Sequence, residues 1–226
     1  MRIPTWLVFF VFLLPLAIVP LLLFADLAIH GLTRLHLSPN VALVLLFGMF
    51  AGGFVNIPIK RIRRATQMVD HPLTIVGLSE LWPHLQRVRD EAIVAVNVGG
   101  CLIPLGIAFY ELGHLASRGP EALLGVSSAI VINTVVCYLI ARPVPNVGIA
   151  MPAFVSPLVS AGLAVFLTPD FEPPVALVAG VVGPLLGADL LHLSDINKID
   201  AGVISIGGAG TFDGIVLSGI VAAYLT

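Results

Sequence analysis

Apolar residues fill long stretches of the chain, and short breaks rich in polar residues, glycine or proline separate these stretches. Most stretches approach the roughly 20 residues that an α-helix needs to cross the hydrocarbon core of a membrane. Their apolar positions do not alternate with polar ones, so we expect helices and not the strands of a closed barrel. The predicted spans cover residues 5–30, 41–59, 91–110, 122–141, 150–168, 173–192 and 208–226.

Composition agrees with this pattern. Of 226 residues, 58% are hydrophobic and only 11% are charged, which exposes too much apolar surface for a soluble globule. The predicted fold is therefore all-α, a polytopic membrane bundle of about seven spans that forms one domain over residues 1–226. Within it, one polar insertion at about 60–90 is expected to lie in the cytoplasm or at the membrane interface.

Basic residues give the bundle an orientation, because cytoplasmic loops next to spans are enriched in Lys and Arg. With the N-terminus in the cytoplasm, nine of the eleven basic residues fall on the inner side and only Arg34 and Arg118 fall outside. An odd number of spans then places the C-terminus outside. The nine inner residues are Arg2, Lys60, Arg61, Arg63, Arg64, Arg87, Arg89, Arg142 and Lys198.

Several kinds of site are not expected from the residues present. Cys101 and Cys137 both fall inside predicted spans, which argues against a disulfide framework. Glu111 and His114 share a helical face, but no zinc-binding motif surrounds them, and the chain has no phosphate-binding loop. We therefore predict no metal, no cofactor and no nucleic-acid partner. The sequence indicates the lipid bilayer as a partner. It does not determine the oligomeric state.

Two aspartates stand out, because an ionisable residue inside a span is costly and marks a functional site by default. Asp189 ends the sixth predicted span, and Asp213 begins the seventh, so both are expected at similar depth on adjacent antiparallel helices. A close carboxylate pair shares a proton, and its two members can serve as base and acid. Alternatively, Asp213 only caps the last helix, whose glycine-rich entrance is expected to be unwound and which could be a half-helix.

The blocks "GPLLGADLLHL" and "SIGGAGTFDGIVLSGI" resemble a family of uncharacterised archaeal and bacterial polytopic membrane proteins, classified only as a domain of unknown function. The resemblance covers most of the chain. It implies a multi-span protein of the prokaryotic plasma membrane and supplies no activity.

A second resemblance is to the intramembrane aspartic proteases, which include presenilin and signal peptide peptidase. In that group one catalytic aspartate lies in the sixth span, and the other follows a Gly-x-Gly-Asp motif in the seventh. Asp189 and Asp213 match in span order, direction and depth, although Thr211 and Phe212 separate Gly210 from Asp213. The resemblance implies catalytic roles for both aspartates.

The same comparison assigns substrate-binding roles. Gly208 and Gly210 would give a substrate backbone close access to the aspartates. Pro152 and Ala153, in "MPAF", are similar to the Pro-Ala-Leu motif of the proteases, although they occur earlier in the chain.

Three functions are compatible with these features. The leading hypothesis is a presenilin-like intramembrane aspartic endopeptidase that hydrolyses a transmembrane helical peptide at the cytoplasmic side of the bilayer. The first alternative is a small transporter or channel whose embedded aspartates bind a proton or cation. The second is a non-catalytic membrane assembly protein in which the aspartates only pair helices.

Overall fold

The architecture was determined from a computed structural model, which describes residues 5–69, 87–144, 148–194 and 203–226. The middle of the predicted polar insertion, residues 70–86, lies outside these ranges, and so do residues 195–202 of the connection between the two aspartates.

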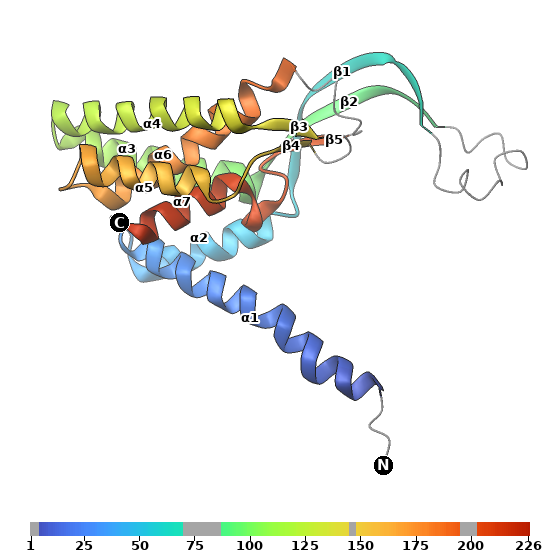
Figure 1. Cartoon of the computed structure of the whole chain (residues 1–226), viewed down its shortest axis with the longest axis horizontal. Helices are drawn as coiled ribbons and strands as arrows, with labels where there is room; N and C mark the ends of the chain where they lie inside the picture. Colours follow the sequence, from blue (N-terminus) through green and yellow to red (C-terminus); the bar gives the residue numbers. More distant parts are fainter. Residues whose placement is uncertain (1–4, 70–86, 145–147, 195–202) are drawn as a thin grey trace, which may run out of the picture.

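Helices make up most of the described chain (Figure 1). Three helical segments, Val98–Ser117, Pro120–Ile140 and Glu172–Leu190, are long and apolar enough to cross a membrane. The prediction of a mostly helical chain is therefore confirmed, and three of its helical segments have the length and composition of membrane spans. The α-helices are α1 (Thr5–Thr33), α2 (Pro39–Gly52), α3 (Ile103–Ser117), α4 (Pro120–Ile140), α5 (Val155–Leu167), α6 (Glu172–Pro184) and α7 (Gly214–Leu225).

Strands gather at one end of the helices, and two of them extend beyond it as a long curved ribbon (Figure 1). Strand β1 (Asn56–Val69) pairs antiparallel with β2 (Arg87–Asn97), and β2 pairs in parallel with β5 (Val203–Ile206). A separate small hairpin joins β3 (Arg142–Val144) to β4 (Gly148–Ala150).

These strands correct the expectation of helix alone. The predicted helix over 41–59 stops at Gly52, and the predicted helix over 91–110 begins as a strand. The strand was mistaken for helix because β2 is the central strand of the sheet and is buried on both faces. Its consecutive residues Val94, Ala95 and Val96 are all buried. A strand buried on both faces reads as an uninterrupted apolar run, and periodicity does not separate it from a helix.

Glycines allow the sheet to join the helices. A Cβ atom on Gly99 would collide with the backbone of Gly52 and Gly53 at the end of α2, and one on Gly100 would collide with Gly207 after β5. The chain between β2 and α3 forms a π-helix, η4 (Val98–Leu102), at this crossing. Three backbone segments therefore meet with no side chain between them.

Helix α6 forms the centre of the bundle. Every residue from Pro174 to Val181 is buried, and α3, α4, α5 and α7 all pack against this helix. Asn133 of α4 links its own helix to two of its neighbours through hydrogen bonds. The Asn133 Nδ2 atom donates to Ser156 Oγ of α5 at 3.0 Å and to the Ala179 carbonyl of α6 at 2.9 Å, and Ser156 in turn hydrogen-bonds Ser218 of α7.

Candidate functional site

Asp189 lies where α6 changes its winding. The helix continues beyond Pro184 as a π-helix, η5 (Leu185–Leu190), which contains the aspartate. Segments of π-helix are rare and occur frequently at functional sites. Here the wider turn packs closely against α4, since a Cβ atom on Gly187 would lie 2.8 Å from Cys137 Cβ. Asp189 is thus held on a rigid, closely packed segment.

Asp213 lies where the chain enters α7. After β5, Gly207 and Gly210 adopt positive φ angles of 71° and 61°, and a single 3₁₀ turn, η7 (Gly210–Phe212), follows. Asp213 then occupies the N-cap of α7, where its Oδ1 accepts from the Ile215 N–H at 3.0 Å. The expected unwound entrance and the capping role of Asp213 are therefore both present.

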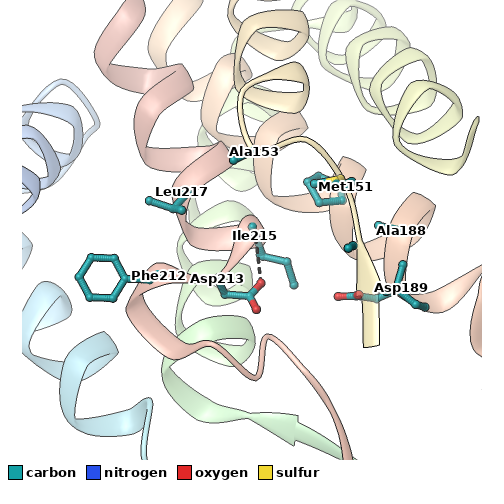
Figure 2. Close-up of a pocket in the computed structure, with 12 residues that line it drawn as sticks. Met151, Ala153, Ala188, Asp189, Phe212, Asp213, Ile215 and Leu217 are labelled. Atoms are coloured by element: carbon teal, nitrogen blue, oxygen red, sulfur yellow. Dashed lines mark hydrogen bonds between the residues drawn. The ribbon is translucent and has the colours of Figure 1, made fainter. Parts of the chain in front are cut away.

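The two aspartates line one cavity of about 260 Å³ at the sheet end of the helices. Figure 2 shows their carboxylates pointing toward one another across this space, Asp189 from η5 and Asp213 from the start of α7. Asp213 therefore has two roles in the structure. Its Oδ1 caps α7, and its carboxylate lines the cavity opposite Asp189.

Apolar side chains form most of the remaining wall. Met151 lies beside Asp189 on one side, and Phe212, Ile215 and Leu217 lie near Asp213 on the other (Figure 2). No basic side chain is among the described residues that line the cavity. The two carboxylates therefore face each other without a neutralising cation from the described part of the chain.

Two backbone N–H groups hold the Asp213 carboxylate at the start of α7. The Ala209 N–H donates to its Oδ2 at 3.2 Å and the Ile215 N–H donates to its Oδ1 at 3.0 Å, and both bonds favour the ionised carboxylate. The described chain offers the Asp189 carboxylate no comparable hydrogen-bond donor. The surroundings of the two groups are therefore unequal.

The four residues predicted to bind substrate take different places. Ala153 lines the cavity of the two aspartates, and Pro152 lines a neighbouring groove of about 500 Å³. Neither Gly208 nor Gly210 is on the cavity wall. Gly210 instead provides a close backbone approach to Gly53, because a Cβ atom on Gly210 would lie 3.0 Å from Gly53 Cα.

The sequence did not reveal the part of the wall that β4 supplies. Ile149, Ala150 and Met151 run along the cavity beside Asp189. The available signal was the sequence "RPVPNVGIA", whose prolines and glycine are typical of a turn between short strands. The predicted spans end at 141 and resume at 150, so this segment was expected to be only a connection between two helices.

Comparisons with known proteins give one result. No curated protein and no solved structure matches the chain. The resemblance to presenilin therefore remains unconfirmed. The family described as "Protein of unknown function (DUF1614)" matches residues 50–225, which include both strands of the long ribbon, both aspartates and all helices from α3 to α7. Because this match spans most of the sequence, the chain belongs to the DUF1614 family.

Proposed function

We propose that this protein is an intramembrane aspartic hydrolase that cleaves a peptide bond at one edge of the bilayer. The observation that carries the proposal is the pair of carboxylates, Asp189 and Asp213, facing each other across one cavity (Figure 2). Two carboxylates at close quarters hold one proton between them, which supplies a base and an acid in the same site.

The unequal surroundings of the two groups suggest which role each performs. Asp213 accepts two backbone hydrogen bonds, which favour its ionised form, so we assign it as the base. Asp189 would hold the proton and donate it to the carbonyl oxygen of the substrate. The cavity volume of about 260 Å³ is enough for a water molecule beside a substrate backbone.

The chemical step follows from these roles. Asp213 takes a proton from water as the water oxygen attacks the carbonyl carbon, and Asp189 gives its proton to the carbonyl oxygen. When the tetrahedral intermediate collapses, the proton on Asp213 passes to the leaving nitrogen and the C–N bond breaks. The carbonyl re-forms and returns its proton to Asp189, so the pair recovers its starting state.

The orientation of the protein is also part of the proposal. Most of the basic residues in the described chain lie at the sheet end, on β1, β2 and β3, whereas Arg34 and Arg118 lie at the opposite ends of their helices. By the positive-inside rule, the sheet end and the cavity face the cytoplasm. We propose seven spans, an inner N-terminus and an outer C-terminus, in the plasma membrane of a prokaryote.

The substrate we propose is a transmembrane peptide segment. The cavity walls are mainly apolar, as a segment leaving the bilayer requires, and the neighbouring groove continues along Pro152 and Leu139. Ala153 and Pro152 are the predicted contacts to this segment.

The test uses the full chain in lipid nanodiscs with a panel of transmembrane peptides, and mass spectrometry identifies the products. We expect cleavage within or beside the apolar segment, reduced about 100-fold or more in Asp189→Asn and in Asp213→Asn. Asp170→Asn, an exposed aspartate between α5 and α6, is the control and should retain full activity. Full activity in either site variant would exclude the proposal.

Proton or cation transport is the second candidate, favoured by the interrupted winding of α6 at η5 beside Asp189. Vesicles containing the protein, loaded with a pH-sensitive dye, separate the two functions. Flux that requires both aspartates, in the absence of peptide cleavage, would replace the hydrolase with a transporter.

A further inference from the structure

A second hollow lies on the surface of the helices, distant from the two aspartates. It is a groove of about 520 Å³ between α2 and α3, and its apolar walls are Val41, Leu45, Ile103 and Ile107. Helix α2 begins beside this groove and ends at the glycine contacts near η7, and its 14 residues span about 21 Å. The groove is therefore separate from the candidate active site.

One end of the groove is polar and firmly built. His36, on the connection between α1 and α2, donates from its backbone N–H to Glu111 Oε1 at 3.2 Å, and its Nδ1 lies 2.9 Å from Oε2. Glu111 is fully buried. The Tyr110 hydroxyl donates to the His36 carbonyl at 3.1 Å, and the His114 ring stacks on His36 with centroids 4.7 Å apart. These contacts fix the connection on α3.

Gly106 keeps the groove open. It lies in the middle of α3, where glycine costs about 1 kcal/mol relative to alanine, and it lines the groove. A Cβ atom added there would meet nothing within 4 Å, in contrast to Gly99 and Gly100, whose neighbours leave no room for a side chain. Packing inside the chain therefore does not require glycine at position 106.

We propose that this groove binds one acyl chain of an anionic phospholipid. Val44 and Phe47 are also exposed on α2, so this helix presents apolar side chains outward beside the groove, from where a lipid can enter. At the polar end, the Ser38 hydroxyl, which accepts from the Val41 N–H, can donate its proton to the headgroup. Arg34, exposed on the same connection, supplies the positive charge that a phosphate requires. This inference is independent of the proposed hydrolase.

The experiment uses the full chain in nanodiscs that contain a trace of phosphatidylglycerol with a photoreactive diazirine on its acyl chain. After illumination, mass spectrometry maps the labelled peptides. We expect labelling to concentrate on α2 and α3 around Val41, Leu45 and Ile107. Labelling spread evenly over all exposed apolar helices would show general lipid contact only and would overturn the proposal.

Two glycine variants make the test specific. Gly106→Leu places a side chain in the groove and should reduce its labelling about tenfold, the loss expected when roughly two methylene groups of the lipid are displaced. Gly162→Leu in α5 is the matched control, because Gly162 also has nothing within 4 Å and does not line the groove. Unchanged labelling in Gly106→Leu would overturn the proposal.

Two further measurements keep the proposal testable if Gly106→Leu fails to fold. Val41→Trp fills the same groove from the partly exposed side of α2 and should also reduce labelling. We expect photoreactive phosphatidylglycerol to label the wild-type groove more strongly than photoreactive phosphatidylcholine does. In Arg34→Gln, labelling by phosphatidylglycerol should fall to about the level of labelling by phosphatidylcholine. Equal labelling of wild type by both lipids would remove the headgroup part of the proposal. Peptide cleavage by these variants reports separately on the hydrolase.

Discussion

The side chain of Asn133 occupies the space beside Gly183 that any larger residue would need. A Cβ atom at position 183 would lie 2.9 Å from Asn133 Cγ and nearer still to its Nδ2. Asn133 is fully buried and joins α4 to α5 and α6 through its two hydrogen bonds. Helices α4 and α6 can therefore approach this closely only because position 183 has no side chain. The same approach sets the position of η5 and Asp189.

Gly183→Ala should destabilise the protein by about 1 to 3 kcal/mol, because the new methyl group displaces Asn133 from its partners. Unfolding by sodium dodecyl sulfate in mixed micelles measures the effect. Gly162→Ala is the control, since its methyl group meets nothing within 4 Å and alanine favours the helix. Equal stability of the two variants would contradict the contact between Gly183 and Asn133.

Asn97→Ala should destabilise the junction of sheet and helices by about 2 to 4 kcal/mol, because one buried and two partly buried hydrogen bonds are lost. Asn97 Oδ1 accepts from the Gly100 N–H at 2.7 Å, and its Nδ2 donates to the Gly53 carbonyl at 2.8 Å and to Asn56 Oδ1 at 3.1 Å. The same detergent titration measures the loss. Asn40→Ala, an exposed asparagine of α2, should change stability by less than about 0.5 kcal/mol.

Replacement of Asn97 by aspartate tests the two halves of this amide separately. The aspartate keeps an acceptor for Gly100 but cannot donate to Gly53 or Asn56, so we expect a larger loss than in Asn97→Ala if the charge stays buried. A variant as stable as wild type would show that the donated bonds contribute nothing.

His36→Ala should destabilise the protein by about 2 kcal/mol or more, because it leaves the fully buried Glu111 carboxylate with only a backbone partner. The double variant His36→Ala/Glu111→Leu should recover part of this loss, since no buried charge remains. A double-mutant cycle of detergent unfolding measures the coupling energy. Additive effects of the two changes would contradict the pairing.

Asp213→Asn should separate helix capping from proton transfer. Asparagine caps a helix as well as aspartate does, so we expect α7 to remain folded while peptide cleavage is lost. Asp213→Ala should lose cleavage and also about 1 kcal/mol of stability, because the cap at Ile215 is removed. Cleavage that survives in Asp213→Asn would assign the residue to capping alone.

The sequence predicted the longest helices well because their apolar runs are long and do not alternate, and α4 agrees with its expected span within two residues. It also predicted that Asp189 and Asp213 share one end of the bundle, since consecutive antiparallel helices place those positions together. The strands were missed because the apolar side chains of β2 are buried on both faces and carry no period of two.

The exact winding at the site could not be predicted either. Nothing in "GPLLGADLL" specifies a π-helix, which arises where Gly187 meets Cys137 and Tyr138 of α4. That contact joins residues about fifty positions apart, so local sequence does not reveal it. The lining by Ile149 and Met151 depends in the same way on the β3–β4 hairpin, which packs beside η5.

The parallel pairing of β5 with β2 sets the depth of Asp213. Val96 lies opposite Ile206, and only six residues separate Ile206 from Asp213, with two of them, Gly207 and Gly210, fixed in left-handed turns. A two-residue slip of β5 along β2 would carry the start of α7 about 7 Å along the strand direction, away from Asp189. The register of a short strand therefore determines whether the two carboxylates line the same cavity.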